Sequence, residues 1–152
     1  MRLCPSLVRL LPAVVMLGAV SAVGAQAQER HIFNPPGTPT NLPFSNGIQI
    51  GNTLYIAGMQ GTKSDSIEAE TRSTLANVKK VLDAAGFKPS DVVQVTVYLK
   101  DVNDFPKMNA AYREFFPDPK PTRTTVEVAR LVNDAHVEIT CVAVRSPGGS
   151  AQ

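Results

Sequence analysis

The stretch that decides the fold is "LANVKKVLDAAGFKPSDVVQVTVYLK", residues 75–100, in which a helical pattern runs directly into a strand pattern. Apolar side chains recur at helical spacing in its first half: Leu75, Val78, Val81, Leu82 and Ala85. Asp65 and Glu68 form a capping-box-like start, and Gly86 supplies a left-handed stop. We therefore predict an amphipathic helix over residues 67–85.

The second half of this stretch is a strand whose two faces are both largely apolar. Two alternating sets share the faces, Val93, Val95, Val97 and Leu99 on one and Val92, Gln94, Thr96 and Tyr98 on the other. Strands of this kind lie inside a sheet that is covered on both sides. We therefore predict a central strand over residues 91–100.

Further strands and one further helix lie on either side of this stretch. "GIQI" and "TLYIAG" flank Gly51-Asn52 in the pattern of a tight hairpin. A second amphipathic helix is predicted from about residue 104 to residue 116. Two strands, 122–130 and 136–145, close the chain, and Asn133-Asp134 makes the turn between them.

The resulting order, β-β-α-β-α-β-β, predicts an α+β domain with both helices packed on one face of a mixed sheet. The opposite face keeps apolar side chains of the central strand and must meet water or a partner. An exposed apolar patch of that size marks an interface, so we expect an oligomer.

Residues 1–27 have the pattern of a cleavable signal peptide. Arg2 and Arg9 lie around the start of an apolar block, residues 10–23, and Ala25-Gln26-Ala27 matches an A-x-A cleavage site. The block is short for a bilayer span, which takes about 20 apolar residues, so an uncleaved anchor is the less favoured alternative. We predict export to the periplasm or the medium, with no membrane attachment after cleavage.

The rest of the chain is predicted to be an extended arm over 28–46, a single domain over 47–146 and a flexible tail over 147–152. Because residues 1–27 hold two arginines and no acidic residue, the remainder carries 13 basic and 13 acidic side chains. Nucleic-acid binding through counterion release needs a basic patch, and this neutral balance offers none. We predict no nucleic-acid partner.

Residues that commonly bind metals are few. Cys141 is the only cysteine after residue 27, so an intrachain disulfide is excluded there, and it is either a buried strand thiol or a reactive one. His31 lies in the predicted arm and His136 at the start of a strand, and no cluster of ligands follows from them. We predict no metal.

Arg123, in "PTRTTVEVAR" (residues 121–130), and Glu138 are the unusual residues of the last two strands. A guanidinium is a planar fork that suits a carboxylate, and a carboxylate nearby can position water or move a proton. Salt-bridged or solvated surface positions are the plainer interpretation of both. In an antiparallel hairpin about six residues would separate them, or roughly 20 Å, so they could cooperate only across a subunit interface.

The segment "PTRTTVEVARLVNDAHVEI" resembles the Rid family of reactive intermediate deaminases, also called the YjgF or L-PSP family. The match covers residues 43–145 in order, through "PFSNGIQIGNTLYIAGMQG", "ANVKKVLDAAGF", "VVQVTVYLKDVNDFPKMNAAYREFF" and "HVEITCVAVR". The resemblance implies a chorismate-mutase-like fold and a homotrimer with clefts between subunits. It also implies hydrolysis of enamines and imines, such as 2-iminopropanoate and 2-iminobutanoate, to 2-oxo acids and ammonia without metal or organic cofactor.

The resemblance also implies roles for particular residues. Arg123 matches the arginine that holds the substrate carboxylate, and Glu138 matches the glutamate thought to orient water or transfer a proton. Gly58 and Asn109 match positions that line the cleft. A bulge or turn role for Gly58, and a capping or surface role for Asn109, remain open.

Some positions depart from the family pattern. Phe44 stands where a tyrosine is frequent, and Thr125 stands where a cysteine is frequent, so both are predicted to contact substrate and to alter its preference. Thr124 replaces a serine or a small apolar residue, and the loop 59–66 is shorter than in many members.

Three functions are therefore compared. The favoured one is a cofactor-independent deaminase of imines that bear a carboxylate. The alternative is a non-catalytic trimer that binds a small carboxylate or acts like a chaperone. A ribonuclease is least favoured, because the mature chain lacks both a basic excess and a histidine pair for RNA cleavage.

Overall fold

The computed structural model describes residues 28–146, and these form six strands and two helices. The strands are β1 (Arg30–Phe33), β2 (Gly47–Ile50), β3 (Thr53–Met59), β4 (Val92–Leu99), β5 (Thr122–Glu127) and β6 (Val137–Val144). The helices are α1 (Ile67–Ala84) and α2 (Phe105–Phe115), with single 3-10 turns at Pro89–Asp91, Val102–Asp104 and Val132–Asp134. The predicted signal peptide, 1–27, and the predicted tail, 147–152, lie outside the described residues.

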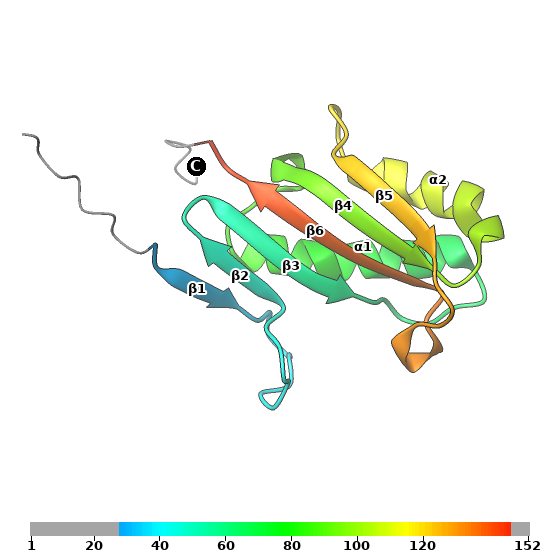
Figure 1. The fold of residues 1–152 in the computed structure, drawn as a ribbon, viewed down its shortest axis with the longest axis horizontal. Helices are drawn as coiled ribbons and strands as arrows, with labels where there is room; N and C mark the ends of the chain where they lie inside the picture. Colours follow the sequence, from blue (N-terminus) through cyan, green and yellow to red (C-terminus); the bar gives the residue numbers. More distant parts are fainter. Residues whose placement is uncertain (1–27, 147–152) are drawn as a thin grey trace, which may run out of the picture.

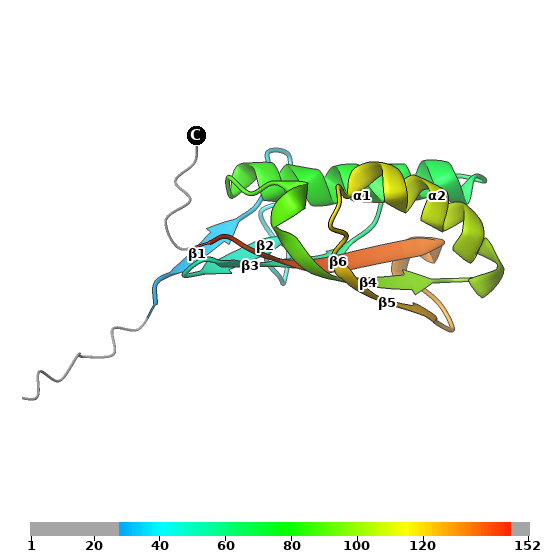
Figure 2. The same ribbon diagram turned by 90° about the horizontal axis from the view of Figure 1, so that it is seen from above.

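All six strands belong to one mixed sheet in the order β1-β2-β3-β6-β4-β5 (Figure 1). Both helices lie on the same side of this sheet, as the view from above shows (Figure 2). The predicted α+β class and the predicted one-sided helix layer are confirmed. Over residues 28–146, no helix has the length and apolar character needed to cross a bilayer.

Helix α1 begins and ends through local capping. The side chain of Ser66, in extended conformation, accepts a hydrogen bond from the Ala69 amide at 3.3 Å, so Ser66 is the N-cap, one residue after the predicted Asp65. Gly86 follows the helix with φ +70°, which confirms the predicted left-handed stop. The apolar stripe of α1 is fully buried against the sheet, at Leu75, Val78, Val81 and Leu82.

The core lies between the helices and one face of the sheet. That face of the sheet supplies Leu54, Ile56, Val95, Val97, Leu99, Val137, Ile139, Cys141 and Ala143. Each fully buried Val, Leu or Ile side chain stabilises the fold by about 1.5–3 kcal/mol relative to exposure. Burial also raises the pKa of the Cys141 thiol to about 12, so Cys141 is a packed, protonated strand thiol.

The predicted arm over residues 28–46 contains a strand that the sequence reading did not identify. β1 pairs antiparallel with β2, with Ile32 opposite Ile48, and forms one edge of the sheet. The first part of the segment is hydrogen-bonded to the domain, and the rest, residues 34–46, contains turns, one of them closed by a 3.1 Å hydrogen bond from the Thr38 amide to the Pro35 carbonyl. The strand has only four residues, and the Pro-, Asn- and Gly-rich composition of the residues that follow it indicated an extended arm.

The predicted hairpin between the last two strands is wrong. β5 pairs parallel with β4, and β6 pairs antiparallel with β4 on the other side, so β4 lies between them. The chain between β5 and β6 therefore crosses over β4 at one end of the sheet. It bends at Asn133 and Asp134, which have φ 58° and 54°.

The other face of the sheet has no helices on it. Its register rows run through Ile48, Tyr55 and Val142, and through Glu138, Tyr98 and Val126. Tyr55 is 50% exposed and Val126 is 40% exposed. Within a single chain the central strand is thus covered on one side, and the predicted partner for the other side stays a prediction.

Two neighbouring members of the predicted faces of β4, Val92 and Val93, are exchanged. A register irregularity between Val92 and Gln94 leaves Val92 buried and turns Val93 outward, 46% exposed. The alternation of the remaining residues is as predicted, with Val95, Val97 and Leu99 buried.

Candidate active site

Arg123 lies on the helix side of β5. It pairs with Val95 of β4, which pairs with Cys141 of β6, and both partners are buried under the helices. Its guanidinium carbon lies 4.5 Å from the ring centroid of Tyr112 and 5.4 Å from that of Phe105, both on α2. The two aromatic rings therefore hold the guanidinium through cation–π contacts.

A cavity of about 390 Å³ opens beside this guanidinium. Its lining residues are Asn109, Tyr112, Arg113, Lys120, Pro121 and Arg123. The structure thus brings Arg123 and Asn109 together at one cavity. Asn109 faces a shared cavity from the middle of α2, which removes the helix-capping interpretation.

Two hydroxyls around Arg123 are buried without a hydrogen-bond partner among the described residues: Tyr112 Oη and Thr125 Oγ1. Burial raises the pKa of the Tyr112 hydroxyl to about 12, although the Arg123 charge opposes this shift. Tyr112 therefore stays protonated at neutral pH. Thr125 lies two residues from Arg123 on the same face of β5, opposite Val97.

Glu138 of β6 lies on the face of the sheet that has no helices, the open face. There it is grouped with Gly58 and Gln60 and not with Arg123. The Gln60 amide Nε2 donates a hydrogen bond to Glu138 Oε2 at 2.7 Å. Gly58 of β3 lies close to the other carboxylate oxygen of Glu138. A Cβ atom at residue 58 would collide with this Oε1. A glycine is therefore required for the backbone of β3 to approach the Glu138 carboxylate this closely.

Gln60 is itself fixed by two other amides. Asn77 Nδ2 of α1 donates to the Gln60 backbone carbonyl at 2.8 Å, and Asn133 Nδ2 donates to Gln60 Oε1 at 3.2 Å. Because its oxygen accepts from Asn133, the amide of Gln60 must present its nitrogen to Glu138. The chain Asn133–Gln60–Glu138 orients the carboxylate.

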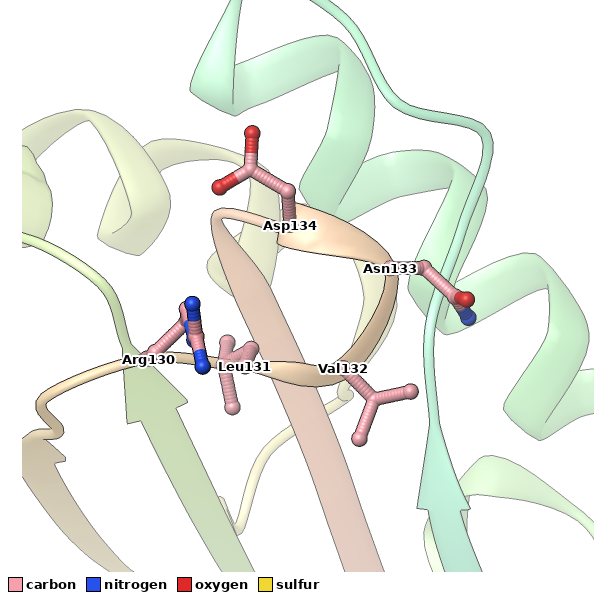
Figure 3. A pocket seen from close by; sticks show the side chains of 5 residues that line it. All are labelled: Arg130, Leu131, Val132, Asn133 and Asp134. Carbon is pink, nitrogen blue, oxygen red and sulfur yellow. The ribbon is translucent and has the colours of Figure 1, made fainter.

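The loop that carries Asn133 is held by ion pairs. Asp134 lies 2.6 Å from both Lys63 Nζ and Lys100 Nζ, and these hydrogen bonds hold the pKa of its carboxyl far below the ordinary value. Figure 3 shows this loop, residues 130–134, around a cavity of about 520 Å³. None of the predicted site residues lines that cavity.

Arg123 and Glu138 lie on opposite faces of the sheet. The predicted separation along a hairpin does not apply, since β4 lies between β5 and β6. On β4, Arg123 pairs with Val95 and Glu138 pairs with Tyr98, only three residues further along the strand. The sheet itself, rather than length along a hairpin, keeps the two side chains apart in one chain. That they cooperate across a subunit interface therefore stays a prediction, now based on their opposite faces.

Phe44 is not among the residues that line the Arg123 cavity. It lies between β1 and β2 with 53% of the residue exposed. Its ring is available to a ligand or to another chain, and its predicted contact with substrate stays a prediction.

Gln60 and Tyr112 contact the predicted site residues but were not predicted from the sequence as part of the site. Tyr112 fits the apolar stripe of α2, and a tyrosine in such a stripe next to an arginine-bearing strand is the signal that could have found it. Gln60 follows a strand in a polar loop, and nothing in its sequence context marks it. For residues 28–146, no three His, Cys, Asp or Glu side chains are grouped to hold a metal ion.

Comparison with known proteins gives one family. The family model described as "Endoribonuclease L-PSP" matches residues 37–145. The 2-iminobutanoate/2-iminopropanoate deaminase of Escherichia coli K12 is 39% identical over 112 residues, which cover 68% of this chain and 88% of that protein.

Two solved structures support the same assignment. The YjgF gene product of E. coli has a TM-score of 0.66 at 38% identity, covering 68% of this chain and 89% of its own. E. coli TdcF with bound serine has a TM-score of 0.70 at 32% identity, covering 76% and 99%. This chain belongs to the Rid family, also called the YjgF or endoribonuclease L-PSP family.

Proposed function

We propose that this protein hydrolyses enamines and imines that carry a carboxylate, giving 2-oxo acids and ammonia. The observation that carries the proposal is the Arg123 guanidinium, held over Tyr112 and Phe105 at the edge of a cavity that Asn109 also lines. A guanidinium in this setting binds a carboxylate through paired, charge-assisted hydrogen bonds. Similarity to a protein named 2-iminobutanoate/2-iminopropanoate deaminase supports this substrate class.

Glu138 is the proposed proton-transfer group. As the Glu138 carboxylate accepts a proton from water, the water oxygen bonds to the imine carbon, and the C=N π electrons move to nitrogen, which takes up a proton. Glu138, having passed the first proton to the nitrogen, accepts the hydroxyl proton of the resulting carbinolamine and delivers it to the amine nitrogen as the C=O bond forms and the C–N bond breaks. Ammonia leaves, and a 2-oxo acid remains.

We propose that a second copy of the chain completes the site. Arg123 and Glu138 face opposite sides of one sheet, so a substrate held by one chain's Arg123 needs the Glu138 of another. The exposed apolar side chains of the open face, including Tyr55 and Val126, supply a surface for such a contact. A homotrimer, as the family resemblance implies, provides three such sites.

We also propose that the protein acts outside the cytoplasm. The support is the basic start, the apolar block and the A-x-A motif within residues 1–27. Fractionation of cells that produce the full chain, with mass analysis of the product, tests this. Recovery of an intact chain in the cytoplasm would contradict it.

The deaminase proposal is tested with the protein lacking residues 1–27. An amino-acid oxidase generates the imine, and semicarbazide competes for it, so an active deaminase lowers semicarbazone formation. Arg123→Ala is expected to lower kcat/KM on the order of a hundredfold, because it removes the carboxylate partner. Arg30→Ala, which removes an exposed arginine of β1 at the opposite edge of the sheet from β5, is the matched control.

Two outcomes would overturn the proposal: no acceleration of imine loss, or an unchanged rate in Arg123→Ala. Calorimetric binding of a small carboxylate without turnover would favour the non-catalytic alternative.

A further inference from the structure

The cavity beside Arg123 has an excess of positive charge. Arg113, Lys120 and Arg123 line it, and its other lining residues, Asn109, Tyr112 and Pro121, carry no negative charge. One substrate carboxylate neutralises the charge of Arg123 alone. The cations of Arg113 and Lys120 then remain at the same opening.

Lys120 is held in place by the end of α2. Its Nζ donates to the Phe116 carbonyl at 2.5 Å and to the Arg113 carbonyl at 3.4 Å. The Asp118 carboxylate lies 3.5 Å from this Nζ and is 86% exposed, so it offsets part of the charge. Lys120 is therefore a fixed but partly compensated cation.

Arg113 is the less compensated cation. It lies in the last turn of α2 and is exposed. Among residues 28–146, no carboxylate lies within 4.0 Å of its guanidinium, whereas Arg72 on α1 is paired with Glu114 at 2.9 Å. The Arg113 guanidinium can therefore donate paired hydrogen bonds to a second anionic group on a bound ligand.

We infer that the preferred substrates are imines with a second anionic group, that is, imino dicarboxylates. This inference rests on the proposed deaminase function. Arg123 holds the carboxylate next to the imine carbon, and Arg113 and Lys120 attract the anionic group at the other end of the molecule. A charge pair at a partly exposed site favours such a ligand on the order of tenfold.

The test compares two imines in the semicarbazide assay. One is generated by an oxidase from aspartate or glutamate, and the other from alanine. The ratio of kcat/KM for the dicarboxylate imine to kcat/KM for the monocarboxylate imine is expected to be about ten or more. Because the interaction is partly exposed, this ratio should fall as ionic strength rises.

Substitutions of Arg113 test whether its charge causes the preference for the dicarboxylate imine. Arg113→Glu is expected to lower the ratio about a hundredfold, and Arg113→Gln about tenfold, since the first adds repulsion to the loss of attraction. Arg30→Glu is the matched control, because β1 lies at the opposite edge of the sheet from β5. It should leave the ratio unchanged.

The possible failures are distinguishable. Turnover of the alanine-derived imine with a ratio near one, or a ratio that Arg113→Glu leaves unchanged, overturns the dicarboxylate preference and leaves the deaminase function standing. Turnover of neither imine overturns both.

Discussion

At the scale of single residues, the orientation of Arg123 depends on the rings beneath it. The guanidinium contacts Tyr112 and Phe105, and Tyr112 is itself only 4% exposed. An arginine on a flexible stem loses rotamer freedom when it binds a ligand, so stacking on fixed rings lowers the cost of binding.

Replacing Tyr112 tests this role. Tyr112→Leu removes the ring and is expected to raise KM about three- to tenfold while changing kcat less, since cation–π contacts contribute about 0.5–2 kcal/mol. Tyr112→Phe keeps the ring and removes a buried hydroxyl that has no partner among the described residues, so it should retain wild-type KM and equal or greater stability. Steady-state kinetics and urea unfolding give both quantities. Equal KM values for the two variants would contradict the role.

Gln60 is expected to position the Glu138 carboxylate, as Tyr112 positions the Arg123 guanidinium. Gln60→Leu removes the 2.7 Å hydrogen bond to the Glu138 carboxylate and should lower kcat on the order of tenfold with little change in KM. The matched control is Gln49→Leu, whose side-chain amide donates, among residues 28–146, to the Gly51 carbonyl and not to a predicted site residue. A rise in KM with unchanged kcat would show that Gln60 contacts substrate rather than positions Glu138.

At the scale of elements, a buried carboxylate ties the start of α1 to the start of β6. Glu70 is fully buried and accepts hydrogen bonds from the His136 backbone amide at 2.7 Å, from His136 Nδ1 at 2.8 Å and from the Ser64 amide at 3.2 Å. Burial raises the pKa of Glu70, but these hydrogen bonds outweigh it, so its pKa lies below the ordinary 4.5.

This pair predicts a pH-dependent contribution to stability. Because the folded pKa of Glu70 lies below its unfolded pKa, its contribution is present above about pH 4.5 and is lost as pH falls through the lower folded value. Glu70→Ala should lower the free energy of unfolding by about 3 kcal/mol or more at neutral pH, since it leaves buried donors unpaired. Urea unfolding across pH measures this, with Asp65→Ala, which removes an exposed carboxylate just before α1, as the control. Equal losses in both variants would contradict it.

At the scale of the whole molecule, the site is divided between two faces of one sheet. The half with Arg123 lies between β5 and α2, and the half with Glu138 lies on the face of the sheet without helices, beside β3. The proposed function therefore requires assembly, and assembly can be tested by complementation.

Two inactive variants should restore activity when they assemble together. In mixed trimers of Arg123→Ala and Glu138→Gln chains, a site that takes Arg123 from one chain and Glu138 from the other is intact. Random mixing at equal amounts gives roughly a quarter of the sites both groups. Co-expression with two purification tags, followed by the imine assay, measures this fraction. Activity no greater than that of the separate variants would contradict a shared site.

The sequence by itself determined the helices, the alternating faces of the strands and the family. The helices and the strand faces depend on local periodicity and capping, which were visible in residues 75–100 and in the Gly51-Asn52 turn. The family was indicated by the resemblance of the segments within residues 43–145. Membership of the family also gave Arg123, Glu138, Gly58 and Asn109 as candidates. The predicted signal peptide also came from the sequence alone and remains a prediction.

Only the tertiary structure decided how these candidates are grouped. Neighbouring strands in the chain do not have to be neighbours in a sheet, and local pattern gives no preference between a β5–β6 hairpin and the insertion of β4 between them. That choice depends on long-range pairing, which buries Val95 beside Cys141 and places Arg123 over Tyr112. The same pairing sets Arg123 and Glu138 on opposite faces, and so makes a second chain part of the proposed site.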